Sequence, residues 1–331
     1  MKPAAVATLL MLAEVLGFTF LLGVFSPPFW AFLGGGMAGT LGAWLLYGLA
    51  AIVLGAILNR VQRGEGLGAL GFRYHRGLRA DVGAGVVAYA ILYLASLPLD
   101  LAVLPDRVGS SAALLEQLGL RSPALVLGGG GLLALVFGFV TGAFHEEIRF
   151  RGYYQGVGSR ESAPLVGFVM ALVPFSLGHY FAHPDWSPGR VLATVVPGIV
   201  FGLLYHATGS LVAVMTTHAL ANWIGAHPSL MVVATGSREA GYATAAALGL
   251  AFALVVYLRR FAEVRELAEA TRDMLRDRPL FGLVAGAVSG AALLAVWPLR
   301  SSSWPCLVAG FVLVGVAIVG KRARREDRAS G

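Results

Sequence analysis

Residues 124–153, ALVLGGGGLLALVFGFVTGAFHEEIRFRGY, join a long apolar run to a charged end. The first part, 124–144, carries no charged side chain, and about 20 apolar residues suffice for a helix to cross a bilayer. Five ionisable side chains then follow, namely His145, Glu146, Glu147, Arg149 and Arg151. Because an ionisable group on a membrane helix is costly, it indicates a functional site. The stretch therefore predicts a membrane helix that carries chemically active groups at its end.

The composition of the whole chain supports a membrane protein. Of 331 residues, 57% are hydrophobic and 13% are charged, against about 25% charged in a typical soluble domain. These values exclude an ordinary soluble enzyme, and also a disordered chain, which requires low hydrophobicity. The single cysteine, Cys306, excludes a disulfide framework. The net charge of +7 comes from basic residues between apolar runs, so we expect contact with a lipid bilayer and not with nucleic acid.

Ten apolar segments are candidates for membrane helices: 5–25, 31–58, 83–104, 124–147, 163–181, 191–205, 210–226, 241–258, 280–298 and 305–320. Basic residues are dense after the second, fourth and eighth segments and in the tail, and sparse in the alternate loops. Since basic loops favour the cytoplasm, this pattern predicts an integral membrane protein with both termini cytoplasmic. The frequent use of Ala, Gly, Leu, Val and Arg favours a bacterial cytoplasmic membrane as its location.

We therefore expect an all-α fold, a polytopic membrane bundle of about ten transmembrane helices with a four-helix core. Residues 1–123 would form N-terminal transmembrane helices, 124–226 the core, and 227–331 C-terminal transmembrane helices and a basic cytoplasmic tail. Two acidic residues outside the core, Glu14 and Asp100, are solitary within their segments. For both we expect a structural role.

Inside the core, the first polar cluster lies at the end of the fourth segment. Glu147 and Arg151 are four positions apart, so on a helix they face each other and form an ion pair. Glu146 points about 100° away from its neighbour and remains available for chemistry. A site at this depth requires the helix to continue past Arg151 to about Gly158, because Glu146 would otherwise lie at the inner membrane surface.

Further polar groups lie in the fifth and seventh segments. His179 is near the end of the fifth, and His218 and Asn222 share one face of the seventh because they are four positions apart. Together with Glu146, three helices thus offer a carboxylate, two imidazoles and a carboxamide. This combination favours a catalytic or ion-binding site.

Three short motifs in this core resemble those of one family. They are Glu146-Glu147-x-x-x-Arg151, Phe175-x-x-x-His179 and His218-x-x-x-Asn222, in this order along the chain. Together they resemble the motifs of the CAAX-processing and bacteriocin-processing (CPBP, or Abi) intramembrane proteases, which include the type II CAAX prenyl endopeptidases. The resemblance covers about residues 124–226. It implies a membrane-embedded endopeptidase that hydrolyses peptide bonds of membrane-associated substrates.

The resemblance also implies a role for each motif. Glu146 would be the general base that activates a water molecule, and His179 would position or polarise that water. His218 and Asn222 would form the oxyanion side of the site. The remaining acid and the arginine of the first motif would have an orienting and neutralising role.

The sequence leaves two mechanisms open. Glu146, His179 and His218 could hold Zn²⁺ as three protein ligands beside a water, which would make the chain a metalloprotease. No His-Glu-x-x-His pattern occurs in the chain, so the sequence does not require a metal. We favour the glutamate mechanism, which needs no cofactor.

Two other functions remain as alternatives. A catalytically silent scaffold that binds a partner would keep the same core without turnover. A transporter could use the same polar groups, but transporters often contain inverted repeats, and the sequence shows no repeat. Bacteria generally lack prenylated CAAX proteins, so for a protease we expect a membrane-associated peptide or signalling protein as the substrate.

Overall fold

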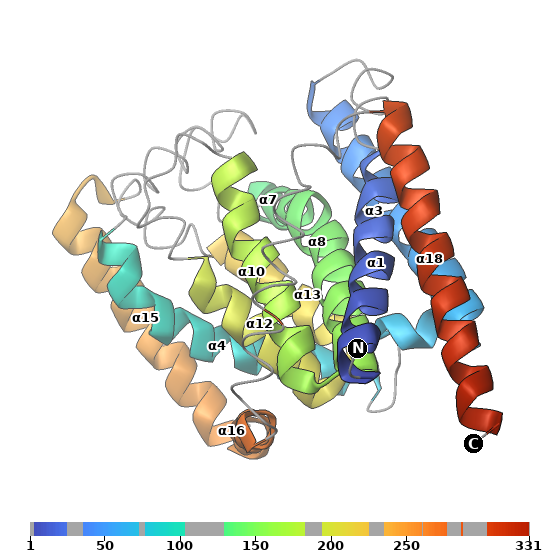
Figure 1. Cartoon of the computed structure of the whole chain (residues 1–331). Helices are drawn as coiled ribbons and strands as arrows, with labels where there is room; N and C mark the ends of the chain where they lie inside the picture. Colours follow the sequence, from blue (N-terminus) through green and yellow to red (C-terminus); the bar gives the residue numbers. More distant parts are fainter. Residues whose placement is uncertain are drawn as a thin grey trace. The chain divides into compact units, whose positions relative to one another are not determined.

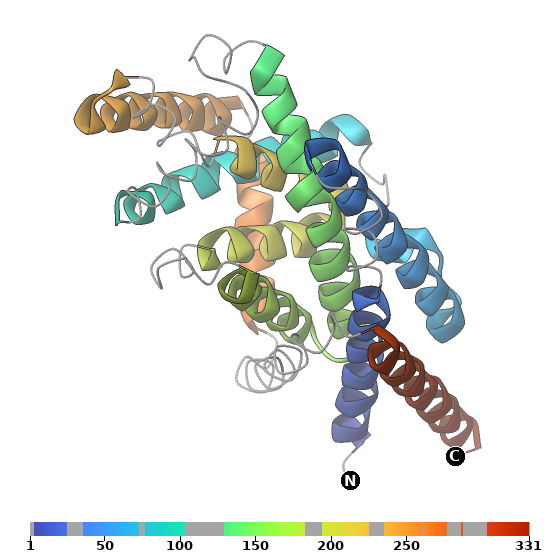
Figure 2. The same ribbon diagram turned by 90° about the horizontal axis from the view of Figure 1, so that it is seen from above.

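The computed structural model describes residues 3–24, 36–72, 77–102, 129–182, 194–224, 235–259, 261–276, 286 and 303–330. These residues are helical or in turns and contain no strand, which confirms the predicted all-α fold (Figures 1 and 2). The chain divides into two compact units. The first comprises Met1–Arg73, His145–Pro174 and Arg272–Gly331, and the second comprises Tyr74–Phe144 and Phe175–Thr271.

Four helices in the described part of the chain are long and apolar enough to cross a membrane. They are α1 (Pro3–Gly23), α3 (Gly36–Arg63), α4 (Leu78–Ala102) and α18 (Ser303–Ser330). Shorter apolar stretches form α12 (Val195–Thr208) and most of α10 (Pro164–Ala182) and α13 (Leu211–Ile224). The protein is therefore an integral membrane protein. The expected span 280–298 lies outside the described residues, apart from residue 286.

The exposed face of α3 shows which surface meets lipid. Leu45, Leu49, Val53, Ile57 and Val61 recur every four residues, and each is between 43% and 58% exposed. A continuous apolar stripe of this kind on a helix is unfavourable in water and favourable in hydrocarbon. The opposite face supplies buried side chains to the first unit. α3 thus separates a lipid surface from the protein interior.

In the first unit, α1 packs against α18 along a seam of glycines. A Cβ on Gly17 would lie 2.7 Å from Val314 Cγ2, and one on Gly310 would lie 2.7 Å from Leu21 Cγ. Small residues at such positions allow two membrane helices to approach closely. The order of these contacts along the two helices is antiparallel, so the N-terminal end of α1 and the C-terminal end of α18 lie at the same end of the pair (Figure 1).

The first unit also gives Glu14, which is solitary within its own segment, its partners on other helices. Its carboxylate is fully buried on α1 and binds Arg63 at 2.8 Å. It also forms an ion pair with Lys321 at the point where the apolar part of α18 ends. The backbone of Asp100 lies within α4, but its side chain is outside the described part of the chain.

α13 is the central helix of the second unit, in contact with α4, α7 and α12. Thr217 Oγ1 donates a hydrogen bond of 2.8 Å to the carbonyl oxygen of Gly85 on α4. A Cβ on Gly85 would lie only 2.5 Å from the carbonyl oxygen of Ala213, so this approach requires glycine. The described helix has 14 residues, about 21 Å, and is therefore shorter than the hydrocarbon core.

One helical run carries the residues of the first motif. It consists of α7 (Gly129–Gly138), the π-helical turn η2 (Phe139–Phe144), α8 (His145–Glu147), the π-helical segment η3 (Ile148–Gln155) and α9 (Gly156–Glu161). The run ends at Ser162, two residues before α10 begins. The prediction that this helix continues past Arg151 to about Gly158 is therefore confirmed.

Candidate active site

The buried pair Glu147–Arg151 is the electrostatic centre of the first motif. Arg151 Nη1 donates to Glu147 Oε1 at 3.0 Å, and both side chains have no solvent exposure. The predicted ion pair across one helical turn is confirmed. Each residue stabilises the buried charge of the other. Removing one partner of a buried ion pair typically costs about 3–5 kcal/mol, because the remaining charge is left uncompensated.

Glu146 lies between two π-helical segments. It is part of α8, which has only three residues, and its side chain is partly exposed whereas Glu147 beside it is fully buried. Arg149 and Arg151 both interact electrostatically with Glu146. π-Helical turns are rare and are frequent at functional sites. The chain therefore places a partly exposed Glu146, whose Oε2 atom is buried, on a distorted helix next to two buried arginines.

Aromatic side chains of α3 cover this part of the helix. The ring of Trp44 stacks on His145 with centroids 4.2 Å apart, and Tyr47 meets the same ring edge-on at 5.7 Å. Arg149 Nη1 donates to Tyr47 Oη at 3.3 Å, and its guanidinium lies 4.1 Å above the ring centre of Phe150. Sequence reasoning missed Trp44 and Tyr47, because both are far from the motif along the chain.

In the second unit, the ring of Phe175 lies between the two predicted histidines. Its centroid is 5.0 Å from that of His179 and 6.0 Å from that of His218, with edge-to-face geometry in both pairs. The ring of Phe201 stacks on that of His218 with centroids 4.7 Å apart, so it fixes the imidazole of His218 from another side. His218 is 5% exposed, and His179 is partly exposed. The fold thus brings the second and third motifs together around one aromatic ring.

The hydrogen bond of His179 defines its tautomer. Nδ1 lies 2.7 Å from the carbonyl oxygen of Phe175. A carbonyl oxygen only accepts hydrogen bonds, so Nδ1 carries the proton. In the neutral ring, Nε2 then has a lone pair that can accept a hydrogen bond from water or bind a metal ion.

Asn222 and His218 both lie against the π-helical turn η2. Asn222 Nδ2 donates to the carbonyl oxygen of Gly138 at 3.0 Å. A Cβ on Gly142 would lie 2.4 Å from Asn222 Nδ2 and 3.7 Å from His218 Nε2. A side chain at position 142 would therefore displace the Asn222 amide from this position. The sequence motifs did not indicate Gly142, which precedes Glu146 by four residues.

The turn before α13 fixes where the third motif begins. Gly209 adopts the left-handed conformation (φ 61°), and its N–H donates to the carbonyl oxygen of Tyr205 at 2.8 Å, which ends α12. Ser210 Oγ then accepts a hydrogen bond from the N–H of Ala213 at 3.3 Å, which caps the start of α13. This cap sets the register that places His218 and Asn222 on one face.

The predicted site residues thus form two groups. The first unit brings Glu147 and Arg151 together beside Glu146. The second unit brings the other three predicted residues together around Phe175 and Gly142, namely His179, His218 and Asn222. Within the ranges described above, no three His, Cys, Asp or Glu side chains form a group that could hold a metal ion.

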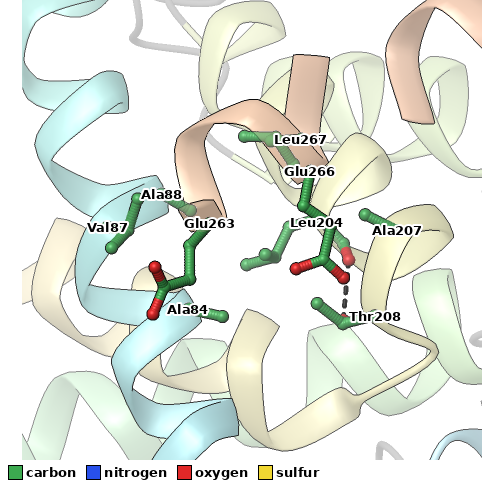
Figure 3. A pocket seen from close by; sticks show the side chains of 9 residues that line it. All are labelled: Ala84, Val87, Ala88, Leu204, Ala207, Thr208, Glu263, Glu266 and Leu267. Atoms are coloured by element: carbon green, nitrogen blue, oxygen red, sulfur yellow. Dashed lines mark hydrogen bonds between the residues drawn. The ribbon is translucent and has the colours of Figure 1, made fainter. Parts of the chain in front are cut away.

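A small pocket elsewhere in the second unit contains none of these residues. It lies between α4, α12 and α16 (Phe261–Arg276). Figure 3 shows the carboxylates of Glu263 and Glu266 on α16 beside Ala84 of α4 and Thr208 of α12. The pocket is distinct from the groups of the three motifs.

Fold and site together define a polytopic membrane protein with acid, imidazole and amide side chains on its apolar helices. Comparison with known families shows which family model part of the chain resembles. Residues 128–224 match the family model described as "Type II CAAX prenyl endopeptidase Rce1-like". This region of the chain is therefore similar to an Rce1-like domain. No curated protein and no solved structure matches the chain.

Proposed function

We propose that the protein is an intramembrane endopeptidase of the CAAX-processing type, with Glu146 as its general base. The observation that carries this proposal is the pairing of a partly exposed Glu146 with the buried ion pair Glu147–Arg151 within the Rce1-like region. The ion pair neutralises the second acid, so the first can act as a base. A scaffold without turnover would not require one carboxylate to be neutralised in an ion pair while its neighbour is left to act as a base.

The reaction begins with a water molecule hydrogen-bonded to Glu146. The carboxylate removes a proton as the water oxygen attacks the scissile carbonyl carbon, and it later delivers that proton to the leaving amine. His179 accepts a hydrogen bond from the same water through Nε2, because its Nδ1 proton is donated to Phe175.

The oxyanion that develops on the carbonyl oxygen needs hydrogen-bond donors. Asn222 Nδ2 has two hydrogens and donates one to Gly138, so the second can be donated to the oxyanion. His218 donates from its ring when Nε2 carries the proton. Loss of one such donor typically lowers the rate by about 10²–10³-fold. This assignment is supported by the packing of both side chains against Gly142, four residues before Glu146 in the chain.

We propose a membrane-associated peptide or protein as the substrate and the bacterial cytoplasmic membrane as the location. The apolar helices restrict access to substrates within or beside the bilayer. The antiparallel packing of α1 and α18 is in agreement with two termini on one side, and the basic tail after residue 320 favours the cytoplasmic side.

Cleavage of a panel of fluorogenic membrane peptides by the detergent-purified protein tests the proposal. We expect Glu146→Gln to lower kcat by at least about 10²-fold, with wild-type thermal stability. The matched control is Glu239→Gln, the same chemical change at an exposed position. Equal cleavage by wild type and Glu146→Gln would refute the general base. Loss of activity with a chelator and its return with Zn²⁺ would replace the glutamate mechanism by a metal-dependent one.

A further inference from the structure

Glu14 on α1 is a buried carboxylate whose hydrogen-bonding capacity is filled. Oε1 accepts hydrogen bonds from Arg63 Nη1 and Tyr153 Oη, both at 2.8 Å. Oε2 accepts from Arg63 Nη2 at 2.9 Å and from Lys321 Nζ. A carboxylate has about four acceptor sites, so this arrangement uses all of them. Such complete coordination of a fully buried side chain indicates a specific role.

A second acid makes the group electrically neutral. Glu161 lies 2.9 Å from Arg63 Nη2 and 3.2 Å from Lys321 Nζ. Two carboxylates therefore face two cations, and Tyr153 supplies a neutral donor. We call these five residues the Glu14 cluster: Glu14, Arg63, Tyr153, Glu161 and Lys321. All of them belong to the first compact unit.

The Glu14 cluster connects the motif helix to helices outside the Rce1-like region. Glu14, Arg63 and Lys321 lie on α1, α3 and α18, whereas Tyr153 lies in η3 within residues 128–224. Tyr153 is also fixed through its ring, which stacks on Phe18 with centroids 3.9 Å apart and planes 16° apart. The hydroxyl and the ring of one fully buried side chain are thus both held by the N-terminal part of the chain.

The position of Tyr153 along the helix lets its contact with Glu14 support the segment that follows Glu146. Tyr153 follows Glu146 by seven residues and lies within the π-helical segment η3. π-Helices are rare, and most occur as single turns. A longer π-helical segment needs support from surrounding side chains, and the Glu14 cluster supplies it.

We propose that Glu14 is a positioning residue that sets the rotation and depth of the helix carrying Glu146, acting through Tyr153. The effect on catalysis rests on the function proposed above, whereas the effect on the helix does not. A displacement of about 1 Å at a catalytic group can lower the rate by about 10²-fold. The helices α1 and α18, which lie outside the family match, thereby become part of the enzyme's active form.

Two substitutions test this role without removing bulk from the protein. Tyr153→Phe removes only the hydroxyl that contacts Glu14, and Glu14→Gln keeps the shape but removes the charge. The matched control is Glu326→Gln, an exposed acid on α18. We measure amide hydrogen exchange of the peptide 144–156 without substrate, and kcat and KM separately with a fluorogenic membrane peptide.

For both variants we expect exchange in 144–156 to be faster by about tenfold, because this helix opens locally more often. We expect kcat to fall by about 10–100-fold with KM changed less than about twofold. The double variant should lose no more than Glu14→Gln alone, since Glu14 acts on the helix through Tyr153. The control should leave all three quantities unchanged.

Unchanged exchange in both variants would overturn the positioning role, whatever their activity. Faster exchange with wild-type kcat would show that the helix moves without consequence for catalysis, and would overturn it as well. If the wild type cleaves no peptide, the proposed protease function fails, while the exchange measurement still decides whether Glu14 holds the helix.

Discussion

Removal of Arg151 tests whether the buried ion pair stabilises the candidate site. In the variant Arg151→Met, the side chain keeps its apolar bulk and loses its charge. Glu147 then remains fully buried without the guanidinium that lies 3.0 Å away. At this distance and an effective dielectric constant of about 20, the lost attraction is about 5 kcal/mol. We therefore expect the free energy of unfolding to fall by about 3–5 kcal/mol.

The chain offers a matched control on α16. Arg265 and Glu269 have the same spacing of four residues and lie 3.4 Å apart, but their side chains are 70% and 49% exposed. Exposed pairs of this kind contribute only about 0.3–0.5 kcal/mol. We expect Arg265→Met to change stability by no more than this amount. The two variants thus compare the same ion pair in buried and exposed surroundings.

Unfolding of both variants in mixed micelles, followed by far-UV circular dichroism, gives the two free energies. The double variant Glu147→Gln with Arg151→Met removes both charges, so it should be more stable than Arg151→Met alone. Two results would refute the reasoning: equal losses for the buried and the exposed arginine, or a double variant whose loss is the sum of the two single losses.

Three further substitutions give separate predictions. Gly142→Ala would place a Cβ 2.4 Å from Asn222 Nδ2, so we expect kcat to fall by about 10²-fold, and wild-type kcat would contradict this packing. Val53→Arg places a charge on the lipid face of α3, where it costs about 2.5–3.5 kcal/mol; a microsomal insertion assay should show less insertion than for Val53→Leu. Gly209→Ala forces a side chain into the left-handed region at φ +61°, so we expect the protein in micelles to lose about 1–2 kcal/mol of stability. The control Gly315→Ala, at a position with open space around it, should not destabilise the protein.

Sequence reasoning succeeded where the determinants are local. Glu147 and Arg151 are one helical turn apart, so helical geometry alone predicts their ion pair. The continuation of the helix past Arg151 followed from the need to place Glu146 within the membrane, and the helix indeed ends at Glu161. The apolar runs predicted the long helices because about 20 residues are needed to cross a bilayer.

Features that depend on distant contacts could not be predicted in this way. The partners of Glu14 could not be predicted from its own segment, because they follow it by 49, 139 and 307 residues. Apolar periodicity also does not distinguish an α-helix from a π-helix over one or two turns, so η2 and η3 were not expected. The roles assigned to Glu146, His179, His218 and Asn222 stay predictions that the cleavage experiment tests.

The pairing of α1 with α18 has a consequence for biosynthesis. Ribosomes add about 5–20 residues per second, so Arg63 is made roughly 2–10 s after Glu14, and Lys321 roughly 15–60 s after it. During this interval α1 has entered the translocon before its final counter-ion exists. The first unit can therefore close only after Lys321 has been made, and nascent chains released before residue 321 should be recognised by membrane quality-control proteases.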